Sequence, residues 1–220
     1  SEFKAIGLQT WNNNGSYLQE FVMVRPKFIS AVAAFDGVAV EQKSIMVITC
    51  QSELKINQAS GYEKVFIKAG ANLQTEARGF VRSNKNLLVL VDKSFANSFG
   101  NLARLKSTMF KTNTSVVFVL TDINPDTWSV DAIHEITEQK MANVVGVLPG
   151  KSKKDEYVIF SGHYDHLGIG GKPINGDSIY NGANDDAAGT TGVIMLAKYF
   201  ATIKNNERTI VFAAFTAEEI

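Results

Sequence analysis

The 220-residue sequence has no surplus of charge of either sign, because 22 lysines and arginines balance 22 aspartates and glutamates. A protein that binds nucleic-acid phosphates or anionic lipids by charge needs a basic surplus, so no nucleic-acid partner is expected. Long apolar runs are missing too: the longest candidate, Val193 to Ile203, carries Lys198 and is much shorter than the roughly 20 residues of a membrane helix. No membrane span is therefore expected.

Cysteine and histidine are scarce. Cys50 is the single cysteine, which excludes an internal disulfide, and its place in an apolar run predicts a buried, unreactive thiol. The three histidines are His134, His163 and His166. Repeats and low-complexity tracts are absent from the sequence, which excludes solenoids and propellers. A hydrophobic fraction of 45 % is nevertheless ample for a folded core.

Short apolar, β-branched runs and helical patterns follow one another along the chain. Strands are predicted at residues 45–50, 64–68, 87–92, 116–121, 143–148, 157–161 and 209–215. Helices are predicted at residues 16–21, 95–109, 130–140 and 187–204. The sequence therefore predicts an α/β protein whose helices cover a mostly buried sheet.

The composition changes along the chain. Residues 31–124 hold short strands, turn residues and connections rich in lysine and asparagine, without a histidine or a cluster of acids. The clustered acids and all three histidines come after Val130. We therefore predict that residues 1–30 begin the main domain, that residues 31–124 form an inserted subdomain, and that residues 125–220 carry the chemistry.

The first chemical motif follows the strand predicted at residues 157–161. His163 and Asp165 are two residues apart in an extended segment, so their side chains share a face. Ligands bind at the carboxyl ends of strands in open α/β sheets, and a carboxylate beside an imidazole commonly orients a metal-binding histidine. A purely structural polar turn is the alternative interpretation.

The second motif places Asp185 and Asp186 among small residues immediately before the helix predicted at 187–204. The simpler interpretation is a helix N-cap, in which a carboxylate accepts backbone N–H groups and complements the helix dipole. One acid is enough for that role. The second acid is therefore a candidate metal ligand.

The third motif, Glu218 and Glu219, follows the strand predicted at residues 209–215. Two glutamates at the end of a buried strand are costly to desolvate without a cation, although a strand that has simply reached solvent would also explain them. Three such clusters in one α/β unit favour the first explanation. Together they predict a zinc-type site of imidazole and carboxylates, with a spare carboxylate available as a base.

Three stretches carry a family resemblance: residues 161–168 (SGHYDHLG), 176–189 (GDSIYNGANDDAAG) and 215–219 (FTAEE). Their order and spacing resemble the co-catalytic zinc aminopeptidases of metallopeptidase family twenty-eight. Relatives of that family include glutamate carboxypeptidase II, the transferrin receptor ectodomain and the glutaminyl cyclases. The resemblance implies a mixed, mostly parallel sheet flanked by helices, of the zinc-exopeptidase type. Within the inserted subdomain, residues 84–92, 94–106 and 115–122 resemble the protease-associated domain that such enzymes often carry, and a generic βαβ accessory piece is the alternative.

The resemblance also implies roles for individual residues of a site that holds two zinc ions. His163 is implied as a ligand of one ion, Asp185 as the carboxylate that bridges both, and Glu219 as a ligand of the other. Glu218 is implied as the general base that takes a proton from the metal-bound water and passes it to the leaving amine. Asp165 is implied as the residue that orients His163.

The chain departs from the family in one respect. Family members use two further ligands, an aspartate and a histidine, downstream of the glutamate pair, whereas this chain stops at Ile220. His134 is predicted to be an ordinary histidine on a helix face, and His166 a turn residue or an outer partner of the site. Asp186 is implied to follow Asp185 through an often cis peptide bond. We therefore expect an incomplete catalytic domain, part of a longer enzyme, that binds metal weakly and has no peptidase activity alone.

The leading hypothesis is a zinc-dependent exopeptidase, most simply an aminopeptidase acting on peptide substrates. One alternative is a non-catalytic binding module on the peptidase scaffold. Another is a glutaminyl cyclase, which uses a similar fold with one zinc ion. The resemblance further implies a periplasmic, extracellular or cell-surface location in a bacterium. The oligomeric state cannot be read from the sequence.

Overall fold

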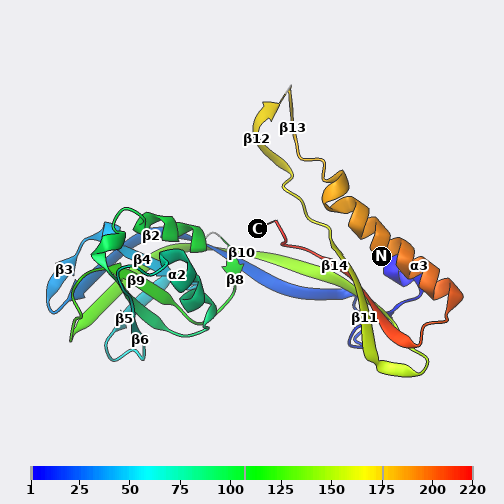
Figure 1. The fold of residues 1–220 in the computed structure, drawn as a ribbon, viewed down its shortest axis with the longest axis horizontal. Helices are drawn as coiled ribbons and strands as arrows, with labels where there is room; N and C mark the ends of the chain where they lie inside the picture. Colours follow the sequence, from blue (N-terminus) through cyan, green and yellow to red (C-terminus); the bar gives the residue numbers. More distant parts are fainter. Residues whose placement is uncertain (1, 107, 175, 220) are drawn as a thin grey trace. The chain divides into compact units, whose positions relative to one another are not determined.

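The computed structural model describes residues 2–106, 108–174 and 176–219 and confirms the mixed α/β class (Figure 1). The chain divides into two compact units: Ser1–Phe21 with Lys140–Ile220 form unit 1, and Val22–Gln139 form unit 2. Parallel and antiparallel strand pairs occur in both units. Within the described ranges, no helix has the length and apolar character that crossing a bilayer requires.

Two long strands carry the chain across the unit boundaries: β2 (Leu18–Phe35) and β10 (Trp128–Leu148). The boundaries fall inside these strands, after residues 21 and 139, whereas the changes in composition come after residues 30 and 124. The two sets of boundaries differ because a change in composition shows where turn residues are frequent, whereas a compact unit is defined by contacts between residues. The resemblance of residues 31–124 to a protease-associated subdomain stays a prediction.

The helices predicted at residues 16–21 and 130–140 are wrong, because the first segment leads into β2 and the second lies within β10. Over the first eight residues of β10, buried and exposed side chains alternate, which is the period of a strand. Ile133 stands on the exposed face and obscures this alternation in the sequence. His134 is therefore not on a helix. It is buried on β10, and its ring centroid lies 5.6 Å from that of Phe28.

Unit 2 contains a four-stranded sheet in the order β4 (Ile45–Ile48), β9 (Val116–Leu120), β7 (Leu87–Val91) and β6 (Glu63–Ile67). All four strands were predicted from their apolar runs. β7 is buried along its whole length between its parallel neighbours β6 and β9, as expected for a central parallel strand. Cys50, which follows β4, is only half-buried, so the expected burial of its thiol is not found.

The helices of unit 2 differ from the prediction. α2 (Leu73–Arg82) was not predicted; it begins where the Asn72 side chain accepts a hydrogen bond from the Thr75 backbone N–H at 3.0 Å. The helix predicted at residues 95–109 is replaced by two 3₁₀ segments, η2 (Lys93–Phe95) and η3 (Phe99–Lys106). The remaining elements of this unit are short: β3 (Val38–Val40), η1 (Gln42–Ser44), β5 (Glu53–Asn57) and β8 (Met109–Phe110).

The sheet of unit 1 is built around β14 (Arg208–Phe215). β14 pairs in parallel with β11 (Lys153–His163) on one side and antiparallel with the last part of β10 on the other. β1 (Gln9–Thr10) adds a short antiparallel pairing to β10. The strands predicted at residues 143–148, 157–161 and 209–215 are thereby confirmed.

Two helices of unit 1 share its core: α1 (Glu2–Ile6) and α3 (Ala188–Ile203), the latter confirming the helix predicted at residues 187–204. Phe160 and Phe212 stack with ring centroids 5.8 Å apart beneath them. The buried members of this core come from both helices, from β14 and from the first loop: Phe3, Leu8, Val193, Ala197, Ile210 and Phe212. The strand ends and the start of α3 are thus fixed to one packed core.

The segment between β11 and α3 forms a hairpin, β12 (Ile169–Ile174) and β13 (Asp177–Ile179), which extends away from the sheet in Figure 1. A short helical turn, η4 (Ala183–Ala187), then leads into α3. Side chains in this segment are therefore held by the sheet at one end and by the helix at the other.

Candidate metal centre

The parallel pairing of β11 with β14 determines where the three motifs meet. In this register His163 lies opposite Phe215, and the Tyr164 backbone N–H donates to the Phe215 carbonyl at 2.8 Å. The two chain segments that follow, one with Asp165 and the other with Glu218 and Glu219, therefore leave the sheet side by side. This edge, beyond the carboxyl ends of neighbouring parallel strands, is where α/β sheets bind ligands.

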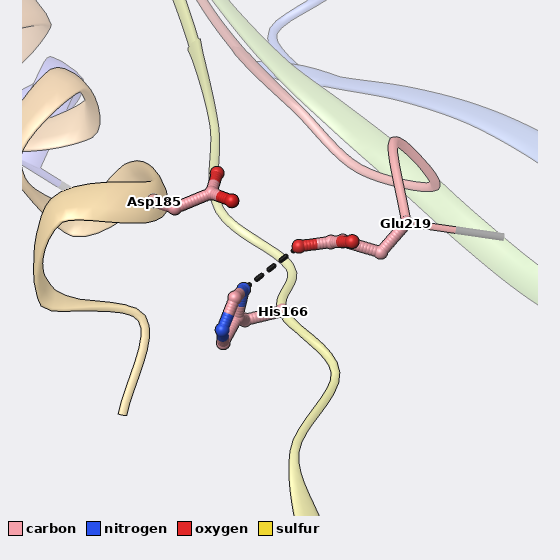
Figure 2. Close-up of side chains that lie close together, drawn as sticks. All are labelled: His166, Asp185 and Glu219. Carbon is pink, nitrogen blue, oxygen red and sulfur yellow. Dashed lines mark hydrogen bonds and ion pairs between the residues drawn. The ribbon is translucent and has the colours of Figure 1, made fainter. Parts of the chain in front are cut away.

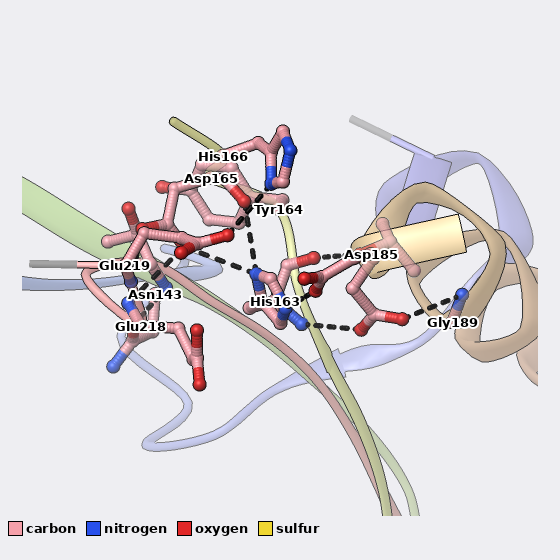
Figure 3. Close-up of polar contacts among 12 residues, drawn as sticks. Asn143, His163, Tyr164, Asp165, His166, Asp185, Gly189, Glu218 and Glu219 are labelled. Atoms are coloured by element: carbon pink, nitrogen blue, oxygen red, sulfur yellow. Dashed lines mark hydrogen bonds and ion pairs between the residues drawn. The ribbon is translucent and has the colours of Figure 1, made fainter. Parts of the chain in front are cut away.

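His163 contacts two different segments through its ring (Figure 3). Nε2 lies 2.9 Å from Asp185 Oδ1, and Nδ1 lies 3.0 Å from the backbone carbonyl oxygen of Asp165. The Asp165 carboxylate is farther away, with Oδ1 at 3.7 Å from Nδ1. A contact at Nδ1 fixes the orientation of the ring and leaves Nε2 directed at Asp185. The closer contact of Asp165 with the ring is thus made by its main chain, and its role in orienting His163 stays a prediction.

The two adjacent aspartates have separate tasks. Asp186 accepts the His163 backbone N–H at Oδ2 (3.0 Å) and the Gly189 backbone N–H at Oδ1 (3.1 Å), so it ties the end of β11 to the first turn of α3. This is the helix-start role that either acid could have filled. Asp185 takes no part in it, and its side chain is 70 % exposed. The peptide bond between the two aspartates is cis, as the resemblance implied.

A second group of ligand atoms gathers around Glu219 (Figure 2). His166 Nδ1 lies 2.8 Å from Glu219 Oε1, and both side chains are about four-fifths buried. One ligand atom each from His166, Asp185 and Glu219 lie within 4.8 Å of one another. Backbone N–H groups of Glu218 and Glu219 point to the Asp165 carboxylate at 3.4 and 3.3 Å. Asp165 thus connects the two halves of the site.

His166 is the residue of this cluster that was not predicted as a ligand. It stands three residues after His163, and in an extended segment that spacing places two side chains on opposite faces. The structure follows this rule, since His163 contacts Asp185 and His166 contacts Glu219. Its residue type was the available signal. Its contact with Glu219 could not be predicted, because no sequence pattern indicates that Glu219 lies beside His166.

The charges around His163 affect its protonation. Desolvation is the largest single influence and lowers the pKa of His163. The hydrogen bonds to the Asp165 carbonyl and the Asp185 carboxylate, together with the negative charges of Glu218 and Asp186, outweigh it and raise the pKa above its usual value. The side chain thus sits in a negative environment that favours a cation of any kind. Glu218 contributes to this field from an exposed position.

The donor set fits zinc. Imidazole nitrogen with carboxylate oxygen is a ligand combination that zinc accepts, whereas calcium and magnesium prefer oxygen alone. Asp185 is shared by both groups: Oδ1 is beside His163, and a carboxylate oxygen lies within 4.8 Å of ligand atoms on His166 and Glu219. A carboxylate placed in this way can offer one oxygen to each of two ions. Beyond this geometry, the assignment of His163, Asp185 and Glu219 as ligands, and of Glu218 and Asp165 as catalytic residues, stays a prediction.

Comparison with known proteins identifies the segment that holds the site. Residues 143–220 match peptidase family M28. We refer to residues 143–220 as the M28 segment because of this match. It contains the end of β10, both parallel strands and all three motifs, so the M28 segment and the candidate metal centre coincide.

The relatives are longer proteins. The chain is 40 % identical over 80 residues to a protein named probable zinc metalloprotease of Pyricularia oryzae, which is 36 % of this chain and 15 % of that protein. It is 39 % identical over 79 residues to a probable zinc metalloprotease of Pyrenophora teres f. teres, covering 36 % and 16 %. The alignments thus span only a small part of these relatives. Among solved structures, an aminopeptidase from Aneurinibacillus sp. strain AM-1 aligns with a TM-score of 0.37 and 17 % identity, over 99 % of this chain and 55 % of that chain.

Proposed function

We propose that the M28 segment binds zinc as part of a two-zinc exopeptidase site, and that the protein acts as an aminopeptidase on peptides. The observation that carries this proposal is the place of Asp185, shared between His163 on one side and the His166–Glu219 pair on the other. The names of the fungal relatives support zinc as the metal. The M28 family match supports peptides as substrates.

Each predicted site residue would have a distinct role in this reaction. Bound zinc would supply a Lewis acid for the scissile carbonyl and lower the pKa of a water molecule. His163, Asp185 and Glu219 would hold the metal. Glu218, adjacent to Glu219 but exposed, would accept a proton from the attacking water on its carboxylate and give it to the nitrogen of the leaving amine. Asp165 would keep the His163 ring in its orientation through the contact at Nδ1.

Zinc binding is tested by calorimetric titration of the chain and of Asp185→Asn. Because Asp185 is shared by both groups, this substitution should weaken binding by more than the roughly 10- to 100-fold that loss of an outer partner costs. The matched control is Asp155→Asn, which removes the same charge from an exposed position at the start of β11. Equal affinities of the two variants would contradict a ligand role for Asp185.

The exopeptidase reaction is tested separately in the metal-loaded full-length enzyme, because this chain alone is expected to have no peptidase activity. An aminopeptidase should release the first residue from a peptide with a free amino terminus and leave its acetylated counterpart intact. Glu218→Gln should keep the zinc content and lower turnover by about 100- to 10,000-fold, the range of a lost general base. Turnover that survives this substitution would exclude Glu218 as the base. Conversion of an N-terminal glutamine to pyroglutamate would instead favour a cyclase.

A further inference from the structure

We propose that His166 is a positioning residue of the metal centre: it donates a hydrogen bond from Nδ1 to Glu219 Oε1 and so directs the other carboxylate oxygen at the metal. This inference rests on the proposed zinc site and adds a residue to it. A carboxylate can only accept, so the 2.8 Å contact requires the proton on Nδ1. A carboxylate held in this way is fixed in rotation before metal arrives.

The His166 ring packs closely against the backbone at Gly182. A Cβ on Gly182 would come within 2.9 Å of both Cγ and Cδ2 of His166, so a side chain at position 182 would collide with the ring. Gly182 also has a φ of +62°, which favours glycine there on conformational grounds. The segment that leads to Asp185 can therefore approach the ring closely only because position 182 carries no side chain.

Tyr180, which directly follows β13, also contacts the ring. The Tyr180 ring meets His166 edge to face, with centroids 6.4 Å apart and an interplanar angle of 76°. Tyr180 is itself placed by its backbone N–H, which donates to the Gly168 carbonyl at 2.9 Å, and by close contact with Gly170, where a Cβ would lie 2.8 Å from its ring. His166 is thus held by packing that does not involve the metal.

Glu219 is held at two points by residues that are neighbours in the chain. Its backbone N–H points to Asp165 Oδ2 at 3.3 Å, and its carboxylate accepts from His166. With only 18 % of its side chain exposed, the Glu219 carboxylate needs a polar partner when no metal is bound. The short segment after β11 therefore orients both proposed metal-binding sides: Asp165 contacts His163, and His166 contacts Glu219.

The test compares two substitutions that separate the hydrogen bond from the ring. His166→Asn keeps a donor at the position of Nδ1 but removes the ring, whereas His166→Phe keeps a ring against Tyr180 and Gly182 but removes the donor. Zinc affinity is measured by competition with a chromophoric chelator. The ligand-field spectrum of the Co²⁺-loaded protein then reports whether a nitrogen ligand has been lost. Thermal melting of the metal-free proteins controls for folding, and His166→Ala replaces the Phe variant if the latter does not fold.

A positioning role predicts that His166→Phe weakens zinc binding by about 10- to 100-fold, that His166→Asn restores most of the affinity, and that the Co²⁺ spectrum is the same in His166→Asn and wild type. If His166→Asn is as weak as His166→Phe and shifts the Co²⁺ bands, His166 is itself a ligand and the proposal is wrong. Wild-type affinity in His166→Phe also overturns it. A wild-type chain that binds no zinc refutes the proposed function instead.

Discussion

Replacing Gly189 with alanine should damage the candidate site from within a helix. A Cβ at this position would lie 2.2 Å from Oδ1 and 2.6 Å from Cγ of Asp186, closer than real contacts allow. The Asp186 carboxylate has little room to move away, because its two oxygens accept the backbone N–H groups of His163 and Gly189. The methyl group would therefore push the carboxylate off both donors.

The size of the effect follows from the contacts that are lost. Hydrogen bonds to a charged group contribute about 1.5–3 kcal/mol each, and two of them join Asp186 to β11 and α3. The better helix propensity of alanine raises the unfolding free energy by at most about 1 kcal/mol. Unfolding free energy should thus fall by about 2–5 kcal/mol in Gly189→Ala. Zinc affinity should fall as well, because Asp185 directly precedes the displaced residue.

Gly192 offers a matched control in the same helix, since a Cβ there would have no heavy atom within 4 Å. Gly192→Ala should raise the unfolding free energy by about 0.5–1 kcal/mol. The assay is urea denaturation followed by far-UV circular dichroism, with zinc titration of the folded variants. Equal stability of the two variants would refute the argument that Asp186 joins strand and helix. A destabilised Gly189→Ala that binds zinc normally would refute the link to Asp185.

Three further predictions test other parts of the structure. Phe212→Ala, which empties a fully buried core position, should lower the unfolding free energy by about 3–5 kcal/mol in urea titrations. Thr209→Val removes a buried hydroxyl that accepts one backbone N–H and donates to a backbone carbonyl, so a loss of about 1–3 kcal/mol is expected in the same assay. For Asp36, the backbone N–H of Thr127 is the main cause of a pKa below the usual value. A carboxyl group whose pKa is lower in the folded state stabilises the fold only while it is ionised. The difference in unfolding free energy between wild type and Asp36→Asn should therefore be largest at about pH 7 and shrink toward about pH 3. A difference that does not change with pH would contradict this prediction.

The strands that were predicted correctly have one property in common: they are short, continuous runs of β-branched and other apolar residues. β7 and β14 are buried on both faces along most of their length, so every position carries the same signal. β2 and the part of β10 before residue 143 lack this property, and each has exposed positions along much of its length. Their sequences mix apolar and polar residues in an order that fits a helix about as well as a strand.

The helix α2, which was not predicted, does have a recognisable pattern in the sequence. Its buried residues Leu73 and Ala77 are four apart, and the partly buried Phe80 and Val81 continue the same face at the next turn. Asn72 stands where an N-cap is expected. The glycine at position 79 and the polar first turn weaken this pattern, but an open position for Gly79 in the structure shows that the helix tolerates it.

The candidate site could be predicted in its residue types but not in its pairing. Adjacent acids before a helix and a glutamate pair after a strand show that carboxylates gather at one end of the sheet. The division of roles between Asp185 and Asp186 depends on which carboxylate reaches the His163 backbone N–H, and that is set by the non-helical backbone of these two residues inside η4. Composition and spacing alone do not distinguish the two acids; the family resemblance alone implied the ligand role for Asp185.

The parallel register of β11 and β14 connects these separate observations. Because His163 pairs opposite Phe215, His166, three residues beyond His163, and Glu219, four residues beyond Phe215, leave the sheet from neighbouring points and come into contact. A shift of this register by one residue would turn alternate side chains to the other face and separate His166 from Glu219. The metal centre therefore depends on a strand pairing fixed by the packed core beneath it. Core substitutions such as Phe212→Ala should then weaken zinc binding in molecules that still fold, whereas substitutions confined to unit 2 should leave it unchanged.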